Sequence, residues 1–547
     1  METVAIVLIL LLAVVISGVL ARMSPVALPL PLYQIALGAC IASVANLGVT
    51  LQPDIFFLLF LPPLLFLDGW RIPKEGLFRD KGTILELALG LVVFTVLGVG
   101  LFINWMIPSM PLPVAFALAA IVSPTDPIAV SAIAKRAPIP KRLMHVLEGE
   151  SLLNDASGLV CMRFAVAAAL TGTFSLASAF GTFLWLAIGG IAIGTAVTWG
   201  TMKVKNWLSR RFGEDSGSQI LVSLLIPFAS YLLAEHFHCS GILAAVAAGI
   251  TMSYAEQSGQ ALAVTRVRRS AVWDTVHFAA NGIIFVLLGE QLPQIVAGAA
   301  RVVEETGHHD PAWLLIYIVA INLALAALRL LWVWASLRFV LFKAARRGKT
   351  IAKPSWRLVA ATSLAGVRGT ITLAGVMTLP LALDDGSPFP ARDLAILLAA
   401  GVIIVSLVAA SVALPRLLNN LTLPPEPSNQ EEEDAARTAA AEAAIRAIEQ
   451  AQHKMGEGRA DADLYIDAGA RIMELYRQRI DGRSKTGDER ELARRIDDIE
   501  RKLRLAGLHA ERDEIYRKAR SRKLSDDAAR KLVREIDLLE ARFGAST

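Results

Sequence analysis

Long apolar blocks separated by short polar segments fill the first three quarters of this chain. A helix of about 20 residues is needed to cross the ~30 Å hydrocarbon core of a bilayer. The pattern predicts an all-α, polytopic membrane bundle of about 13 transmembrane helices. The thirteen blocks lie near residues 3–21, 27–47, 54–69, 83–106, 113–134, 143–170, 176–202, 218–235, 239–254, 271–294, 312–341, 357–380 and 393–416.

The last part of the chain has a different pattern. A linker-like stretch begins near residue 424, and beyond it charged residues are dense and no long apolar run occurs. We therefore predict a membrane domain over residues 1–420 and a cytoplasmic helical tail over 421–547, with regulation or assembly as its possible roles. The Ser525-Asp526-Asp527 stretch predicts a helix start. The apolar stripe expected for that helix consists of Leu532, Ile536, Leu539 and Phe543.

Composition and loop charges exclude several classes and orient the bundle. Hydrophobic residues make up 54% and charged residues 19%, which excludes a soluble enzyme, an isolated DNA-binding domain and a secreted disulfide scaffold. The loops after the odd-numbered blocks carry 22 Lys and Arg residues, whereas the other six loops carry only Arg301 and Arg392. Because cytoplasmic loops are enriched in Lys and Arg, we predict an N-terminus outside and a tail inside. The net charge of +5 is therefore no argument for nucleic acid.

The fifth block contains an acid between two prolines, in Ser123-Pro124-Thr125-Asp126-Pro127. Each proline removes a backbone donor and disfavours helical conformation in the residue before it. We expect a broken helix, whose free backbone groups are tolerated in a membrane only where they line a cavity or are buried in protein. A simple proline kink is the alternative, although a kink does not need the acid.

The sixth block carries polar side chains at helical spacing. Glu150 and Asn154 are four residues apart, as are Ser151 and Asp155, so each pair shares a helix face. A charge in hydrocarbon costs at least ~2.5–3.5 kcal/mol, which favours a functional role. Oxygen ligands suit a hard cation such as Na⁺, and a carboxyl removed from water can hold either a proton or a cation. The stripe indicates ion exchange, with a structural hydrogen-bond network as the alternative.

The twelfth block has a matching interruption at Gly366-Val367-Arg368-Gly369. Blocks five and twelve run in opposite directions, and such paired interruptions indicate an inverted-repeat transporter with crossed, broken helices. Half-helix ends carry partial charges of roughly ±0.5. Asp126 is therefore expected to neutralise the amide ends at the crossing, and Arg368 the carbonyl ends. Arg329, deep in the eleventh block, needs a buried anionic partner, for which we choose Glu150.

Together these motifs resemble the signature of the monovalent cation:proton antiporters, and more narrowly that of the sodium/proton exchangers with an Asn-Asp pair. The resemblance covers roughly residues 1–420 and includes Leu61–Phe66 and Ser240–Ala244. It implies thirteen helices in two inverted repeats, a homodimer, and a mobile core domain that moves against a dimerisation domain.

The resemblance also implies roles for individual residues, with Na⁺ and the proton held in turn at Asp155. The residues implied to bind the ion and the proton are Asp155, Asn154, Ser151, Thr125 through its backbone, and Asp68. The structural charges of the core are Asp126 and Arg368 at the helix crossing, and Glu150 with Arg329. Relatives with two acids at the Asn154-Asp155 position are electrogenic, so the single carboxylate here predicts electroneutral exchange.

We therefore predict a secondary antiporter that exchanges Na⁺ for H⁺ across the bacterial cell membrane by alternating access and contributes to pH and sodium homeostasis. It is predicted to be no enzyme and to have no cofactor, with the cation, the proton, the bilayer and a second copy of the chain as its partners. K⁺ or Li⁺ in place of Na⁺ stays open, because sequence does not give cavity size. A cation channel is disfavoured because no filter-like carbonyl loop or acid ring occurs.

Overall fold

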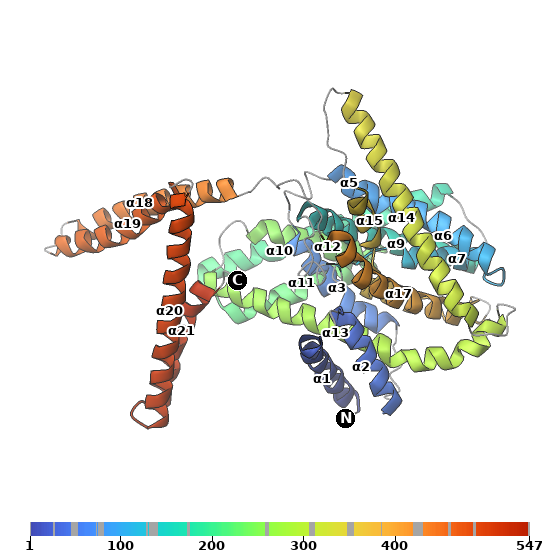
Figure 1. The fold of residues 1–547 in the computed structure, drawn as a ribbon, viewed down its shortest axis with the longest axis horizontal. Helices are drawn as coiled ribbons and strands as arrows, with labels where there is room; N and C mark the ends of the chain where they lie inside the picture. Colours follow the sequence, from blue (N-terminus) through green and yellow to red (C-terminus); the bar gives the residue numbers. More distant parts are fainter. Residues whose placement is uncertain are drawn as a thin grey trace. The chain divides into compact units, whose positions relative to one another are not determined.

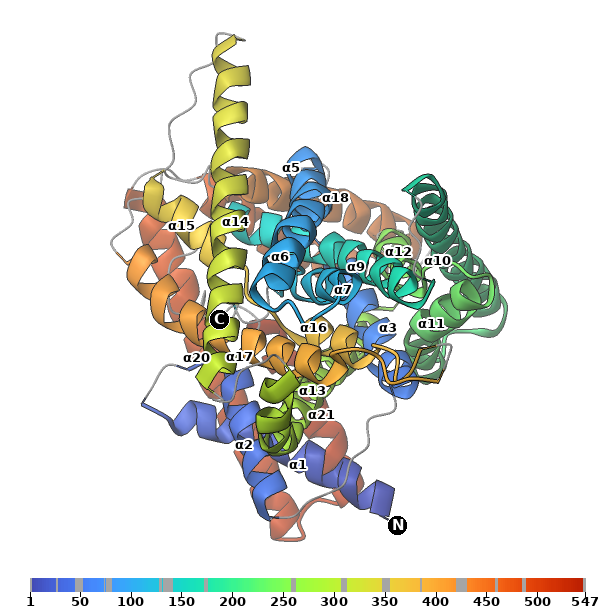
Figure 2. The same ribbon diagram turned by 90° about the vertical axis from the view of Figure 1, so that its right-hand side faces the viewer.

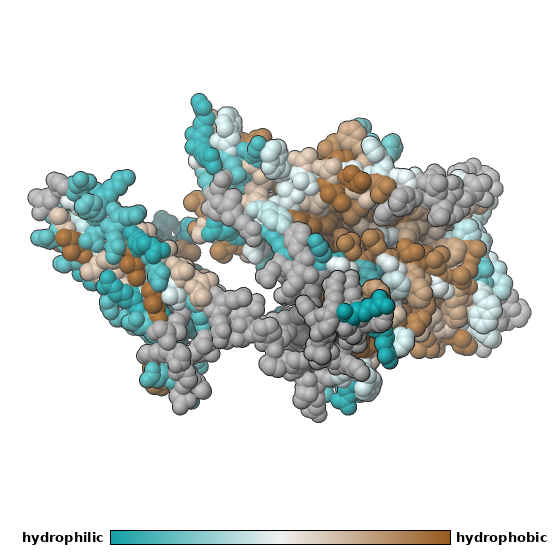
Figure 3. All heavy atoms as spheres, turned by 90° about the horizontal axis from the view of Figure 1, so that it is seen from above, coloured by the Kyte–Doolittle hydropathy of each residue, from teal (hydrophilic) through white to brown (hydrophobic). Residues whose placement is uncertain are grey.

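The computed structural model describes residues 2–25, 28–44, 53–72, 74, 81–126, 130, 141–171, 176–256, 262–305, 312–346, 355–383, 386–419, 430–457, 461–484 and 488–544. The described residues are helical and contain no named strand, only an isolated antiparallel bridge between Ala382 and Pro388. The chain divides into two compact units, Met1–Thr422 and Leu423–Thr547. Figure 3 shows their different chemistry, with broad apolar areas on the first unit and a mostly hydrophilic surface on the second.

The first unit contains two helical bundles, and the first bundle is built around close helix–helix contacts (Figures 1 and 2). Gly38 and Gly289 let α2 and α13 pack backbone against backbone, because a Cβ at either position would overlap a carbonyl of the other helix. Such small residues are how membrane helices approach each other closely. The first bundle comprises α1 (Glu2–Met23), α2 (Leu30–Val44), α3 (Pro53–Arg71), α10 (Leu176–Phe212), α11 (Ser216–His236), α12 (Gly241–Glu256) and α13 (Ala263–Glu305).

The second bundle holds the interrupted segments predicted from the sequence. Its α6, α7 and α9 lie side by side in Figure 2, and α7 is buried along most of its length, as expected for a helix that is apolar all round. Contacts within each bundle are far more extensive than contacts between the two. The second bundle comprises α5 (Lys81–Leu85), the π-helix η1 (Glu86–Leu91), α6 (Val92–Met106), α7 (Leu112–Val122), α9 (Lys141–Thr171), α14 (Ala312–Arg346), α15 (Trp356–Leu364), α16 (Thr370–Met377) and α17 (Arg392–Leu418).

The structure confirms the all-helical membrane fold. Eight helices of the described residues are long and apolar enough to cross a membrane, and α2, α7 and α12 are shorter apolar helices. The count of thirteen and the inverted repeat stay predictions. Many of the basic residues that we assigned to loops lie instead on helices, among them Lys203–Arg211 on α10, Arg266–Arg269 on α13, and Lys343 and Arg346 on α14. The loop assignment was wrong because apolarity marks the depth of the bilayer, whereas a helix can continue beyond it into the polar interface.

The second unit consists of two helix pairs. Its helices are α18 (Gln430–Gly456), which packs on α19 (Ala462–Ser484), and α20 (Asp488–Arg520), which packs on α21 (Asp526–Gly544). The predicted start of α21 is confirmed, since the Ser525 hydroxyl accepts a hydrogen bond from the backbone N–H of Ala528 at 3.3 Å.

The predicted apolar stripe of α21 is only partly correct. The helix buries Ile536, but together with Ala529 and Val533, whereas Leu532 and Leu539 are exposed and the side chain of Phe543 lies outside the described part. The apolar residues of this short helix form two neighbouring stripes, and the position of the partner helix decides which of them is covered.

Candidate functional site

The two interrupted segments meet at their breaks. Helix α7 ends at Val122 and α15 ends at Leu364, and α16 begins only at Thr370. The backbone N–H of Asp126 donates a hydrogen bond to the Val367 carbonyl at 2.7 Å. Pro127, the second proline of the motif, lies outside the described residues. The breaks are therefore joined directly, through backbone groups that the unwound helices leave free.

Two buried charges lie at this crossing. Arg368 donates from Nε to the Val122 carbonyl at 2.9 Å and from Nη1 to the Gly366 carbonyl, so it contacts the last carbonyl of α7 and a carbonyl just beyond the end of α15. Asp126 accepts from the backbone N–H of Thr370, the first residue of α16, at 3.4 Å. Each charge therefore opposes the partial charge of a helix end. Gly369 is required for this approach, because a Cβ there would overlap the Asp126 carboxyl.

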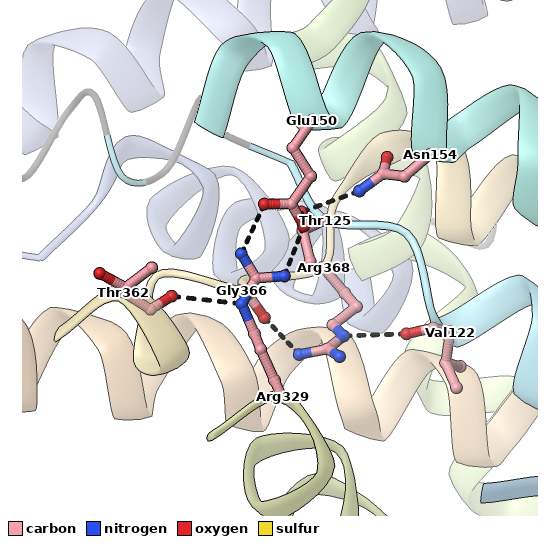
Figure 4. Close-up of polar contacts among 8 residues, drawn as sticks. All are labelled: Val122, Thr125, Glu150, Asn154, Arg329, Thr362, Gly366 and Arg368. Carbon is pink, nitrogen blue, oxygen red and sulfur yellow. Dashed lines mark hydrogen bonds and ion pairs between the residues drawn. The ribbon is translucent and has the colours of Figure 1, made fainter. Parts of the chain in front are cut away.

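Glu150 is bound by a bidentate arginine. Arg329 of α14 donates from Nη1 and Nη2 to the two carboxylate oxygens of Glu150 at 2.5 and 2.7 Å, and from Nε to the Thr362 carbonyl at 3.2 Å (Figure 4). The side chains are only 4% and 1% exposed. Bidentate arginine pairs are among the strongest charge-assisted contacts. The pair fixes α9 against α14 and α15 and leaves Glu150 with a permanent counter-ion.

Thr125 connects this pair to the Asn-Asp motif. Its hydroxyl donates to Glu150 Oε1 at 3.3 Å and accepts from Asn154 Nδ2 at 3.1 Å (Figure 4). The role predicted for Thr125 used only its backbone, and this side-chain link was not predicted. In the sequence, the only indication of this link was a hydroxyl residue inside the predicted helix break. Its position does not show which helix the hydroxyl faces.

Asp155 is in a different situation from Glu150. It is 5% exposed and accepts no hydrogen bond from any residue that the structure describes. Next to it, Asn154 Oδ1 is buried without a hydrogen-bond partner. Ser151 is buried one turn before Asp155 on α9. Buried polar oxygens are normally satisfied, so this end of the stripe has unused capacity to accept a proton or a cation.

Other carboxyls surround Asp155. Asp126, Asp68 and Glu150 are close enough to interact with it electrostatically. Asp68 lies on α3 of the first bundle with an exposed side chain, so its interaction with Asp155 crosses the boundary between the bundles. Among the described residues, no three His, Cys, Asp or Glu side chains gather in a metal-binding arrangement. A cation at Asp155 would thus be held by this carboxylate and by neutral oxygens.

Two further ion pairs were not predicted as pairs. Arg163, two turns after Asp155 on α9, donates to Glu235 of α11 at 3.0 Å and so links the two bundles. Arg269 of α13 is buried and pairs with Glu256 of α12, whose other oxygen accepts from Trp70 Nε1 at 2.7 Å. Charges within or beside apolar blocks were the available signal, but sequence separation hid their partners.

Similarity to known proteins agrees with this geometry. Residues 7–420 match the family described as "Sodium/hydrogen exchanger, transmembrane". An uncharacterized Na⁺/H⁺ exchanger of Escherichia coli (strain K12), YjcE, is 41% identical over 548 residues, 99% of each chain. A sodium, potassium, lithium and rubidium/H⁺ antiporter of Bacillus pumilus (strain SAFR-032) is 43% identical over 423 residues, 76% of this chain and 61% of that protein.

A solved structure shares the fold. The sodium proton antiporter MjNhaP1 from Methanocaldococcus jannaschii covers 77% of this chain and 99% of its own, with a TM-score of 0.58 and 19% identity. The family match extends over both interrupted segments and every residue of the α9 stripe. The chain belongs to the sodium/hydrogen exchanger family and is a multi-pass membrane antiporter of monovalent cations and protons.

Proposed function

We propose that this protein exchanges Na⁺ for H⁺ at Asp155. The supporting observation is the contrast on α9, where Glu150 is neutralised by Arg329 while Asp155 accepts no hydrogen bond from the described residues. A carboxylate that stays paired with an arginine is not expected to exchange protons during transport. A buried carboxylate without one gains stability from either a proton or a cation, which is the requirement for exchange.

The neighbouring oxygens define how the cation is held. Deprotonated Asp155 supplies the negative charge, and the unpartnered Asn154 Oδ1 supplies a neutral oxygen at the adjacent position. Asn154 is oriented by its hydrogen bond to Thr125, which is itself anchored to Glu150. Ser151 is the next oxygen along the stripe. Because Na⁺ and H⁺ use the same carboxylate, binding of one excludes the other, and one Na⁺ is exchanged for one H⁺ without net charge movement.

Transport requires that Asp155 be open to one side of the membrane at a time. Asp155 lies on the second bundle, and the limited contact between the bundles supports movement of the second bundle against the first. We place the protein in the bacterial cell membrane as a homodimer, with the N-terminus outside and the tail in the cytoplasm. There it functions as a carrier without enzymatic activity or a resident cofactor, and supports pH and sodium homeostasis.

K⁺/H⁺ exchange is the second candidate. Two relatives, from Bacillus pumilus and Bacillus subtilis, are named as antiporters of sodium, potassium, lithium and rubidium, and are 43% and 42% identical to this chain. One carboxylate with neutral oxygens binds any hard monovalent cation, so the size of the closed site decides the order of preference.

The experiment that tests both candidates is proton flux into proteoliposomes titrated with Na⁺, Li⁺, K⁺ and Rb⁺, with Asp155→Asn as the inactive control. We expect Na⁺ and Li⁺ to give the lowest half-maximal concentrations, and no flux in the variant. Half-maximal concentrations for K⁺ equal to or below those for Na⁺ would replace the Na⁺ proposal by the K⁺ one. Flux that depends on a clamped membrane potential would contradict electroneutral exchange.

The pH dependence tests direct competition at Asp155. The half-maximal Na⁺ concentration is expected to rise as pH falls, because the proton must leave before Na⁺ binds. At high pH the return step lacks protons, so the rate should pass through a maximum. A half-maximal Na⁺ concentration that stays constant across the acid side would indicate a separate proton-sensing group.

A further inference from the structure

A pocket of about 500 Å³ lies between α10 and α11, away from Asp155. One side is apolar, with Val204, Leu208 and Phe212 along one face of α10. The other side is polar and includes Lys205, Asp215 and Gln219. We call it the α10–α11 pocket. Its mixed lining suits a molecule with a polar and an apolar part.

The polar side contains a buried group that the protein leaves unsatisfied. Gln219 is 6% exposed, and its Nε2 donates to the Ser209 hydroxyl at 3.2 Å, but its Oε1 is buried with no hydrogen-bond partner. A buried acceptor without a donor is unfavourable relative to one that is hydrogen-bonded. The pocket therefore favours a ligand that brings a hydrogen-bond donor to Gln219 Oε1.

Positive charge lies beside this acceptor. Lys205 lines the pocket, and Arg269 of α13 is near enough to interact with it electrostatically. Arg269 is 1% exposed, and its Nε and Nη1 have no hydrogen-bond partner. The nearby carboxylates already have partners. Glu256 pairs with Arg269, and Glu214 accepts from the Leu262 backbone N–H at 3.2 and 3.3 Å. Asp215, which also lines the pocket, accepts from the backbone N–H groups of Gly217 and Ser218. Lys205, which forms no ion pair with a described residue, therefore favours an anionic group next to a donor.

The surroundings locate the pocket at the edge of the bilayer. Trp199 and Trp207 of α10 are 57% and 58% exposed, and Trp residues gather where the hydrocarbon meets the headgroups. The Lys203 ammonium lies over the Trp199 ring at 3.9 Å from its centroid. Basic residues continue to the end of α10 at Arg210 and Arg211. The apolar side of the pocket thus belongs to the lipid-facing surface and the polar side to the headgroup layer.

We propose that the α10–α11 pocket binds one glycerophospholipid whose headgroup carries both a phosphate and a hydrogen-bond donor. The phosphate accepts from Lys205 Nζ, the headgroup ammonium or hydroxyl donates to Gln219 Oε1, and an acyl chain covers Val204 and Leu208. Phosphatidylethanolamine and phosphatidylglycerol have this chemistry. Phosphatidylcholine has the phosphate but no headgroup donor, so it leaves Gln219 Oε1 unsatisfied.

The test is native mass spectrometry of the delipidated full-length protein, titrated separately with these three lipids. We expect phosphatidylethanolamine and phosphatidylglycerol to bind about tenfold more tightly than phosphatidylcholine, the ratio that corresponds to one satisfied buried acceptor. Gln219→Leu should remove this preference, with all three lipids binding alike. Lys205→Gln should weaken all three about tenfold, because the charge-assisted contact to phosphate is common to them.

Two control variants separate the pocket from general effects of charge and packing. Lys203→Gln removes a neighbouring cation of α10 that is not a lining residue, and Ser209→Ala removes the partner of Gln219 Nε2 but keeps the acceptor. Both should retain the preference over phosphatidylcholine. The proposal is overturned if Lys205→Gln binds all three lipids as the wild type does, or if the wild type shows no preference. It is also overturned if glycerol 3-phosphate displaces the lipids at equal concentration, since the ligand would then be a soluble phosphate.

Discussion

Arginine–carboxylate pairs occur in both units of the chain, in opposite surroundings. In the membrane unit, the Arg329 and Glu150 side chains are 4% and 1% exposed. In the tail, those of Arg437 and Glu433 are 55% and 56% exposed. Exposed pairs typically contribute about 0–1 kcal/mol, whereas removal of one partner of a buried pair costs ~3–5 kcal/mol. An arginine–carboxylate pair is therefore essential to the stability of the membrane unit and contributes little to that of the tail.

The comparison explains how the membrane unit can use one carboxylate for transport. The charges around the helix crossing are held by specific partners, Glu150 by Arg329 and Arg368 by the carbonyls of Val122 and Gly366. Asp155 is the exception among the charges of the α9 stripe. The tail has many charged residues, but they are exposed, so water can solvate each charge when its ion pair is lost. The following predictions test this difference, from the largest expected effect to the smallest.

Asp155→Asn should abolish exchange and leave a folded, membrane-inserted protein. The substitution keeps the size of the side chain, and the Asp155 carboxyl accepts no hydrogen bond from the described residues. Proton flux in proteoliposomes should fall to the level of empty vesicles, with an unchanged gel-filtration profile as the folding control. Near-normal flux in this variant would remove Asp155 from the site.

Arg329→Gln should destabilise the membrane unit by about 3–5 kcal/mol, because it leaves Glu150 buried without its counter-ion. Thermal unfolding of the detergent-solubilised protein measures the loss. The double variant Glu150→Gln/Arg329→Gln should recover part of the stability, since it removes the buried charge. Equal melting temperatures for the wild type and Arg329→Gln would mean that this pair is no stronger than those of the tail.

Arg368→Ala should lower both folding yield and exchange, since it uncovers the Val122 carbonyl at the crossing. Arg368→Lys is the matched variant, because it keeps the charge but loses the planar fork that reaches two carbonyls. We expect the yield to fall in the order wild type, Lys, Ala, as measured by the fraction of monodisperse protein after solubilisation. Full yield with merely slower exchange in the alanine variant would contradict a role in stabilising the crossing.

Truncation after residue 425 should change the maximal exchange rate less than about twofold. The ion site and both interrupted segments lie in the first compact unit, Met1–Thr422. Flux per inserted molecule is the quantity to compare with that of the full chain. Complete inactivity of a correctly inserted truncation would show that the tail is part of the transport unit.

Glu540→Gln should have the smallest effect, a loss of stability of the α20–α21 pair. This loss should be present at neutral pH and absent at acidic pH. A hydrogen bond from His509 and the charge of Arg512 hold the pKa of the Glu540 carboxyl below its usual range. This contact therefore stabilises the α20–α21 pair above the ordinary glutamate pKa of ~4.3 and is lost as pH falls through the lower, folded-state pKa. Hydrogen exchange of α20–α21, corrected for intrinsic rate, should differ between variant and wild type at pH 7. The difference should shrink under acidic conditions, and a difference that persists there would exclude this cause.

The prediction from sequence was most successful where the determining forces are local. The two prolines and glycines around Asp126 and Arg368 forecast breaks, and the structure has non-helical backbone at both places. The apolar blocks predicted the membrane helices, because helical period and bilayer thickness act on neighbouring residues. Residue type alone also singled out the buried charges of α9.

Tertiary structure decided the partners. Arg329 and Arg368 are both buried arginines near the middle of apolar blocks. The choice of Arg329 as the partner of Glu150 is confirmed, and the fold adds that Arg368 instead donates to the carbonyls of Val122 and Gly366. The side-chain link of Thr125 to Asn154 and the covered stripe of α21 were decided in the same way. The strength of an ion pair depends on distance and on exclusion of water. The distance between two charges and their separation from water are set by helices that are far apart in the chain. The sequence by itself therefore determined which charged groups are present, whereas the fold determined which of them are neutralised by a partner.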